Sequence, residues 1–117
     1  MCGIVGIAGN TFQSHCRMFR DLLLVDTVRG IDSTGVLTVD QAQGINTMIV
    51  EKELGGPTNL WDWNRSDIFD YKGVVSNPRK IMLGHNRAAT MGSITVDEAH
   101  PFEYDHVIGV HNGTLRD

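Results

Sequence analysis

A cysteine stands directly behind the initiator methionine and could act as a nucleophile at the start of the chain. Because Cys2 is small, trimming of Met1 would leave Cys2 as the N-terminal residue with a free α-amine. Such an amine has an ordinary pKa near ~8, well below that of lysine. It can therefore serve as the general base for the thiol of the same residue. The alternative is that Cys2 is a small buried hydrophobic residue without a chemical role.

Two polar segments follow predicted secondary structure and could border a cleft. Residues 29–35 read RGIDSTG, in which a glycine stop and an Asp or Ser turn lead into a strand. Residues 84–92 read GHNRAATMG and place Arg87 just beyond a strand. A guanidinium in this position could hold a substrate carboxylate through two parallel hydrogen bonds. Each segment taken alone also fits an ordinary turn, with Arg87 as a surface arginine.

The sequence HNG at residues 111–113 offers a pair of hydrogen-bond donors directly after another strand. The side-chain amide of Asn112 and the backbone N–H of Gly113 could stabilise a developing oxyanion. Asn-Gly is also a common tight-turn dipeptide, so a purely structural role fits this segment too. His100 and Pro101 lie between this segment and the preceding one, and could fix the intervening loop.

Hydrophobic spacing predicts the elements that would position these groups. A short buried strand is expected over residues 3–8, where β-branched residues are flanked by glycines. A helix is expected from Phe12 to about Thr27 or Val28, stopped near Gly30. Its apolar face is defined by steps of four, three and four residues, at Phe12, Cys16, Phe19 and Leu23.

The rest of the chain favours strands over helices. Residues 35–39 and 45–50 are predicted to form an antiparallel hairpin, because Asp40, Gln41 and Gly44 supply turn chemistry between them. Residues 51–77 have no clean period, and are interpreted as a loop with short helices. Further strands are predicted over residues 80–84 and 106–110. The expected fold class is therefore α+β, with at least two neighbouring antiparallel strands.

Composition excludes several function classes. The chain has 117 residues and a formal net charge of -4, and no basic run is interleaved with aromatic residues, which argues against nucleic-acid binding. No apolar run approaches the roughly 18 residues of a membrane helix, and no positively charged segment introduces a signal peptide. A bridge between the two cysteines is the weaker interpretation in such a chain. We therefore expect a cytoplasmic protein with no membrane span, metal or cofactor.

The order of these segments resembles that of class II glutamine amidotransferases, which belong to the N-terminal nucleophile hydrolases. The resemblance covers nearly the whole chain, and it is closest to the glucosamine-6-phosphate synthase and amidophosphoribosyltransferase branches. It is carried by MCGIVG at residues 1–6, RGIDSTG at 29–35, GHNRAAT at 84–90, His100-Pro101, and HNG at 111–113.

The resemblance implies a role for three residues in the reaction. Cys2 matches the nucleophile that attacks the side-chain amide of glutamine and forms a γ-glutamyl thioester. Asn112 and Gly113 match the oxyanion hole, the first through its side-chain amide and the second through its backbone N–H.

The resemblance also implies binding roles. Arg87 matches the arginine that holds the glutamine α-carboxylate, and Thr90 lies in the same binding segment. Arg29 matches a supporting residue near the nucleophile. Two positions depart from the family pattern: Ala88 replaces a common aromatic residue, and Met91 replaces a frequent histidine. These changes put in doubt the closure of the site over glutamine or its coupling to an acceptor site.

The fold implied by the resemblance is an αββα sandwich, which a chain of this length holds only in part. We expect one glutaminase domain over residues 1–117, apparently truncated at its C-terminus. The family carboxylate that binds the glutamine α-amine lies further along and has no counterpart before Asp117. A partial sandwich leaves apolar surface uncovered, so marginal stability or self-association is expected.

The expected function is hydrolysis of the glutamine side-chain amide, with ammonia delivered to an acceptor in a synthase domain or subunit. Two alternatives remain open. One is a γ-glutamyl hydrolase that does not transfer ammonia. The other is a non-catalytic truncated domain that acts as a binding module. Intact mass separates enzyme from inactive precursor, because a retained Met1 would block the amine of Cys2.

Overall fold

The computed structural model describes residues 1–60 and 79–114. Within them lie six strands, one α-helix and two short 3-10 helices. In chain order these are β1 (Gly3–Thr11), α1 (Gln13–Val25), η1 (Asp26–Arg29), β2 (Ser33–Ala42), β3 (Ile45–Leu54), η2 (Pro57–Asn59), β4 (Arg79–Arg87), β5 (Phe102–Tyr104) and β6 (Val107–Gly109).

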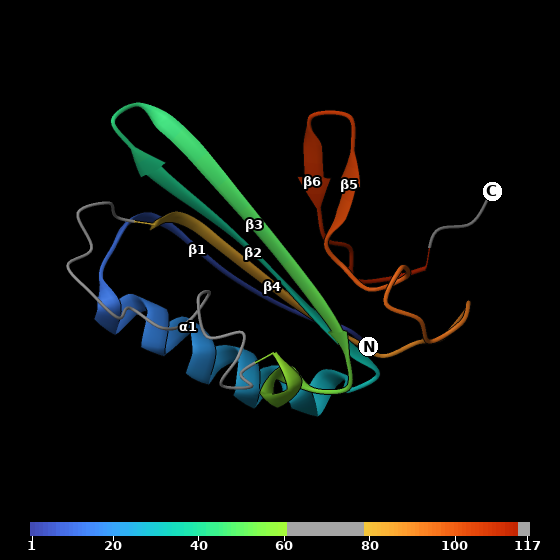
Figure 1. Ribbon diagram of the computed structural model, residues 1–117. Helices are drawn as coiled ribbons and strands as arrows, with labels where there is room; N and C mark the ends of the chain where they lie inside the picture. The colour runs from blue at the N-terminus through green and yellow to red at the C-terminus, as the bar shows by residue number, and fades with distance from the viewer. Residues whose placement is uncertain (61–78, 115–117) are drawn as a thin grey trace.

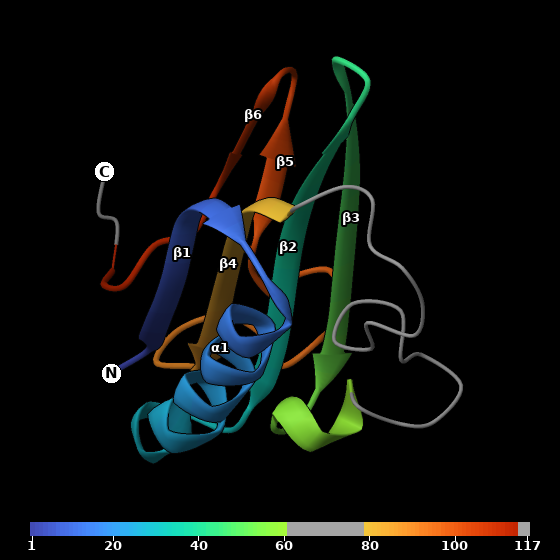
Figure 2. The same cartoon turned by 90° about the vertical axis from the view of Figure 1, so that its left-hand side faces the viewer.

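A four-stranded antiparallel sheet in the order β1-β4-β2-β3 forms the centre of the described structure. The helix α1 covers one face of this sheet, and the β5–β6 hairpin lies over the opposite face (Figures 1 and 2). In the central register, Gly3 of β1 faces Asn86 of β4, and Ser33 of β2 faces Arg87 of the same strand. The start of β1 and the end of β4 therefore lie side by side.

The core lies between α1 and the sheet. Cys16, Phe19 and Leu23 are buried on the inner face of the helix, as their spacing predicts. They pack against Val36 of β2 and Met82 of β4. Full burial of side chains such as Phe19 and Leu23 stabilises the fold by about 1.5–3 kcal/mol each. This packing fixes the sheet against the helix.

The first residue of the predicted helical face is an exception. Phe12 lies before the helix at its N-cap position and is 65% exposed. Its backbone N–H donates to Nδ1 of His15, and its carbonyl accepts from the N–H groups of His15 and Cys16. Phe12 therefore contributes to the start of the helix and not to the core.

The predicted hairpin is confirmed, and both of its strands are longer than predicted. The β2 and β3 strands pair antiparallel through a tight turn in which Gln43 and Gly44 have φ of 50° and 77°. Residues 51–54 extend β3, so the prediction of a loop there is wrong. Those four residues are three charged side chains and a leucine, and they stay extended because the partner strand β2 continues opposite them. Residues 61–77 of that predicted loop lie outside the described residues.

The remaining strands also differ from prediction in extent. The first strand runs to Thr11 and the fourth to Arg87, each beyond its predicted end. The strand predicted over residues 106–110 is confirmed as the shorter β6, and its partner β5 was not predicted. The α+β class with antiparallel neighbours is thus confirmed, whereas the described residues do not establish a complete αββα sandwich.

Neither cysteine is bridged, and both are buried. Within residues 1–60 and 79–114, no helix has the length and apolar character needed to cross a bilayer. The same residues contain no cluster of His, Cys, Asp or Glu with the arrangement of a metal site.

Candidate functional site

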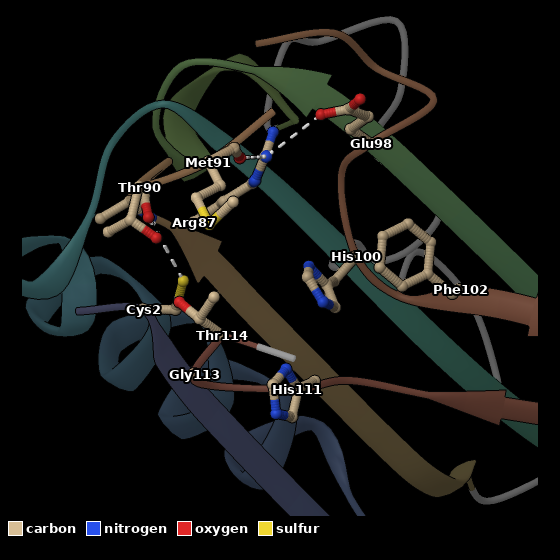
Figure 3. A pocket seen from close by; sticks show the side chains of 11 residues that line it. Cys2, Arg87, Thr90, Met91, Glu98, His100, Phe102, His111, Gly113 and Thr114 are labelled. Carbon is tan, nitrogen blue, oxygen red and sulfur yellow. Dashed lines mark hydrogen bonds and ion pairs between the residues drawn. The ribbon is translucent and has the colours of Figure 1, made fainter. Parts of the chain in front are cut away.

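A cavity of about 480 Å³ opens where the start of β1, the end of β4 and the segments around β5 and β6 meet (Figure 3). It combines one thiol, one guanidinium, one carboxylate and two imidazoles with small and apolar groups. The lining residues are Cys2, Arg87, Ala88, Thr90, Met91, Glu98, His100, Phe102, His111, Gly113 and Thr114.

The thiol of Cys2 is held against the backbone that follows β4. Its Sγ accepts from the N–H of Ala88 at 3.4 Å and lies 3.6 Å from the carbonyl oxygen of the same residue. The carbonyl of Cys2 accepts from Nε of Arg29 at 3.0 Å. Cys2 itself is only 9% exposed. The hydrogen bond from Arg29 therefore fixes the backbone of Cys2, and the contacts with Ala88 fix its sulfur at the cavity wall.

Arg87 is a nearly buried cation at the end of β4, with a side chain 10% exposed. Its Nη1 donates to the carbonyl of Ser93 at 2.7 Å, and its Nη2 donates to the carbonyl of Met91 at 3.0 Å. Nη2 also contacts Oε2 of Glu98 at 3.2 Å, forming an ion pair. The guanidinium is thus fixed by the loop after β4, and three of its five N–H donors are used by these residues.

The segment at residues 29–35 fastens this loop to the sheet. The N–H of Asp32 donates to the carbonyl of Arg87 at 2.9 Å, and Oδ2 of Asp32 accepts from the N–H of Ala89 at 2.7 Å. A Cβ at Gly30 would lie 2.5 Å from backbone atoms of Arg87 and Ala88. The first glycine of the motif is therefore required for close approach to the backbone of Arg87 and Ala88, which borders Cys2.

The second close approach lies at Gly35 of β2. A Cβ there would lie 1.5 Å from the carbonyl oxygen of His100, which precedes Pro101 across a cis peptide bond. The two glycines of one motif thus touch two different segments of the cavity wall. The close approach of Gly35 to the His100 carbonyl places His100 against the face of β2.

Replacing Gly35 with alanine is expected to lower the free energy of unfolding by about 3 kcal/mol or more. The added Cβ would collide with a backbone oxygen, which no side-chain rotation relieves. Gly6→Ala on β1 is the matched control, because its Cβ would meet its nearest atom at an ordinary 3.6 Å. That change should alter stability by about 1 kcal/mol or less. Urea unfolding of both variants measures the difference, and equal effects would contradict the packing argument.

Asn86 is a fully buried polar residue that joins three elements beneath the site. Its Nδ2 donates to the carbonyl of Leu23 at 2.8 Å and to Oδ2 of Asp26 at 3.3 Å. Its Oδ1 accepts from the hydroxyl of Thr34 at 2.8 Å. The side chain therefore links β4 to the end of α1 and to β2, and it leaves no amide hydrogen unpaired.

Burial raises the pKa of Asp26, while the Asn86 hydrogen bond and the charge of Arg29 oppose this rise.

Two buried histidines stack beside the cavity. The rings of His85 and His100 lie 3.9 Å apart, and Phe102 continues the stack at 4.3 Å from His100. Because a carbonyl only accepts, Nε2 of His85 donates to the carbonyl of His111, at 3.1 Å. The ammonium of Lys52 lies 5.3 Å from the centre of the Phe102 ring. The stack therefore ties the end of β4 to the chain just before Asn112 and Gly113.

Both histidines of the stack are held neutral. Burial, followed by the charges of the nearby His85, Arg87, His111 and Lys52, lowers the pKa of His100 to about 4. Burial also lowers the pKa of His85, against the hydrogen bond to His111. A cation in this position would have to be desolvated next to other cations, so the folded chain disfavours protonation.

The stability of the fold is expected to decrease as the pH falls from about 6.5 toward 4. The unfolded chain takes up a proton on His100 near its ordinary pKa of 6.5, whereas the folded chain does so only near 4. The stability is therefore fully present above the higher value and is lost across this window. At the acid end of this pH window Asp26 has the opposite effect on stability, because its raised pKa favours protonation of the folded chain.

His100→Gln removes one of the titrating groups and should flatten this dependence. Urea unfolding at pH 7.5, 5.5 and 4.5 would measure it for both proteins. An unchanged slope in the variant would show that His100 does not carry the pH dependence.

The structure brings most of the predicted site residues together. Cys2, Arg87, Thr90 and Gly113 line the same cavity. Arg29 does not line it, and instead holds the backbone of Cys2. The predicted Asn112 is exposed and does not line the cavity.

Glu98, His85 and Asn86 contribute to the site and were not singled out from the sequence. Glu98 lines the cavity and pairs with Arg87, while His85 and Asn86 connect the surrounding elements. Sequence spacing gave a partial signal for the last two, because both lie within GHNRAAT. A polar residue in the middle of a buried strand requires partners, since an unpaired buried polar group is costly. Glu98 gave no signal of this kind.

Curated proteins that match this chain include two kinds of enzyme. Amidophosphoribosyltransferase of Escherichia coli strain K12 is 32% identical over 118 residues, which cover 98% of this chain and 21% of that protein. The glutamine–fructose-6-phosphate aminotransferase (isomerizing) of Zymomonas mobilis is 36% identical over 123 residues, covering 100% and 18% respectively. The protein of the same name from Bradyrhizobium diazoefficiens is 35% identical over 115 residues, covering 98% and 17%.

The chain thus spans about a fifth of the length of the curated relatives it matches. No protein-family model matches it, and no solved structure is significantly similar. The relatives are nevertheless aligned along essentially the whole chain, including the segments that form the cavity. The chain belongs to the class II glutamine amidotransferases, a family of enzymes.

Proposed function

We propose that the cavity hydrolyses the side-chain amide of glutamine, with Cys2 as the nucleophile, and that the ammonia passes to an acceptor. The observation that carries this proposal is the position of the Cys2 thiol in one cavity with the Arg87 guanidinium and the Gly113 backbone. The thiol can attack an amide there, and the guanidinium can attract the α-carboxylate of the same substrate. The names of the relatives, which denote amido and amino transfer, support the same reaction class.

The proposal requires removal of Met1, and the surroundings of Cys2 favour it. Met1 is 78% exposed, so a peptidase can reach the bond that follows it. Arg29 contacts Met1 only through a weak interaction with Sδ at 3.8 Å. Its stronger hydrogen bond is to the carbonyl of Cys2 at 3.0 Å, and this bond survives removal of Met1. Cys2 would therefore keep its position while gaining a free α-amine.

The first half of the reaction forms a thioester. The free amine of Cys2 takes the proton from Sγ, and Sγ forms a bond to the amide carbon of glutamine. The carbonyl oxygen becomes an oxyanion, for which the N–H of Gly113 and the amide of Asn112 are the proposed donors. As the carbon–nitrogen bond breaks, the ammonium of Cys2 returns its proton to the leaving nitrogen, and ammonia departs.

The second half of the reaction restores the thiol. A water molecule attacks the γ-glutamyl thioester and gives a proton to the amine of Cys2. The carbon–sulfur bond then breaks, the proton passes from the amine to the sulfur, and glutamate leaves. The N–H of Ala88, which lies 3.4 Å from Sγ, would stabilise the sulfur as it departs with negative charge. Ammonia would then reach an acceptor in a synthase domain or subunit, as the transferase names of the relatives suggest for this chain.

The test is a glutaminase assay on full-length protein from which Met1 has been removed, as verified by intact mass. Glutamate and ammonia should appear in equal amounts. The same protein with an uncleaved N-terminal extension is the control, and it should be inactive because the amine of Cys2 is then an amide. Equal activity of the extended protein would remove the amine from the mechanism, and inactivity of both proteins would reject the proposed reaction.

A further inference from the structure

We propose that Asp26 is a positioning residue whose negative charge offsets that of Arg29 beside the α-amine of Cys2 and so keeps this amine able to take the thiol proton. The inference rests on the proposed function, because it concerns the base of that reaction. It starts from the way in which η1 meets the first residues of β1. Both charged side chains of η1 lie against that end of the strand.

The carboxyl group of Asp26 occupies the place where Gly3 lacks a side chain. A Cβ at Gly3 would lie 1.8 Å from Oδ2, 2.2 Å from Cγ and 2.3 Å from Oδ1 of Asp26. The amine nitrogen of Cys2 is within about 5 Å of the Gly3 Cα, because one N–Cα bond and one peptide unit separate them. The carboxylate and the amine therefore lie closer together than the Debye length of about 10 Å, so their charges interact.

Arg29 acts on the same amine with the opposite sign. Its Nε donates to the carbonyl of Cys2 at 3.0 Å, which holds a cation at the residue that carries the amine. A neighbouring cation disfavours the protonated amine and makes it a weaker base, whereas a neighbouring anion favours the protonated form. Because Asp26 and Arg29 belong to one short helix, η1 presents a balanced pair of charges to Cys2.

The other elements around this end of β1 leave that balance in place. The end of α1 contributes the carbonyl of Leu23, and β4 contributes the neutral amide of Asn86, which donates to Asp26 at 3.3 Å. On the cavity side, Arg87 is already paired with Glu98. The titratable side chains that share the cavity wall with these two and the Cys2 thiol are His100 and His111.

The position of Asp26 is not explained by the stability of its own helix. Asp26 is the C-cap residue of α1, where the helix dipole disfavours an anion. Burial also disfavours its charge and raises its pKa, against the Asn86 hydrogen bond and the charge of Arg29. A neutral residue would avoid both effects. The carboxylate is better explained by the ammonium that forms beside it when Met1 is removed.

The experiment titrates the α-amine in full-length protein lacking Met1. In a Cys2→Ser background no thiol titrates with the amine, and nuclear magnetic resonance of the N-terminal residue follows its ionisation. Asp26→Asn keeps the shape of the side chain and an oxygen that can accept from Asn86, and should lower the pKa of the amine by about 0.5 or more. Asp21→Asn on α1, where the side chain is 70% exposed, is the matched control and should leave it unchanged.

The pH dependence of glutamine hydrolysis is the second measurement. The acid limb of kcat/KM reports the base of the free enzyme, so Asp26→Asn should move it to lower pH and raise kcat/KM about threefold below the limb. Arg29→Gln should move it to higher pH. Gly3→Ala should act like Asp26→Asn, because the added methyl displaces the carboxylate, and should have no further effect in the Asp26→Asn background.

Two outcomes separate the inference from the proposed function. An amine pKa that Asp26→Asn does not change would overturn the inference, and an equal loss of kcat/KM at every pH would make Asp26 only a cap of α1. A lowered amine pKa in the variant, with no ammonia release from glutamine by the unsubstituted protein, would support the action of Asp26 on the amine and reject the proposed function.

Discussion

Replacing Cys2 with alanine is expected to lower kcat for glutamine hydrolysis by about 10,000-fold or more. The variant lacks the only protein atom that forms a bond to the substrate carbon in the proposed mechanism. Its fold should persist, because Cys2 lies at the cavity wall and not in the cluster beneath α1. Initial rates of ammonia release, together with thermal unfolding of the same samples, would separate loss of chemistry from loss of structure.

Cys16 provides the internal control for this result. It is 1% exposed within the core, where a thiol is inert. A diazo-ketone analogue of glutamine should therefore modify Cys2 and spare Cys16, and Cys16→Ala should keep most of the activity at some cost in stability. Modification of Cys16, or of both residues equally, would remove the basis for assigning Cys2 as the nucleophile.

Replacing Asn112 with alanine is expected to lower kcat by about two to three orders of magnitude with little change in KM. The oxyanion exists only after the thiol adds to the amide, so a donor to it acts in the transition state. The side chain of Asn112 is exposed beside Gly113, which lines the cavity. We therefore expect Asn112 to turn toward the substrate when glutamine binds.

Arg87 should show the opposite kinetic pattern. A group that contacts the carboxylate in both ground and transition states affects binding, so Arg87→Ala should chiefly raise KM. Arg87→Lys should rescue poorly, because one ammonium cannot reach the carbonyls of Met91 and Ser93, the Glu98 carboxylate and a substrate together. If Asn112 controlled KM and Arg87 controlled kcat, both assignments would be wrong.

The spacing of residues along the chain predicted most of the helices and strands, but it did not predict the contacts between them. The spacing of Cys16, Phe19 and Leu23 predicted the buried helix face, because this spacing depends on the geometry of a single helix. The three residues of β5 are too few to show a period, so that strand was not predicted. The charged residues at the end of β3 were predicted to be a loop, because the sequence of one strand does not reveal its pairing with β2.

The same limit applies to the candidate site. In the sequence, Gly30 fits a turn and Gly35 fits a strand. The structure shows that glycine is needed at both positions because segments more than fifty residues away approach them closely. The ion pair of Arg87 with Glu98 depends on how one loop folds back on β4. The cavity residues could be predicted only where their order resembled a known family. Their hydrogen-bond partners required the three-dimensional structure.

The strand order of the central sheet determines when an active site can exist during synthesis. Among the described strands, β1 pairs with β4 alone, and Gly3 faces Asn86. A growing chain can form the local β2–β3 hairpin early, whereas β1 must wait for β4, which follows β3 in the chain. Until β4 has left the ribosome, the N-terminal thiol has no Ala88 backbone beside it and no Arg87 across from it. Nascent chains should therefore not consume glutamine, and translation itself would delay the chemistry until the sheet is complete.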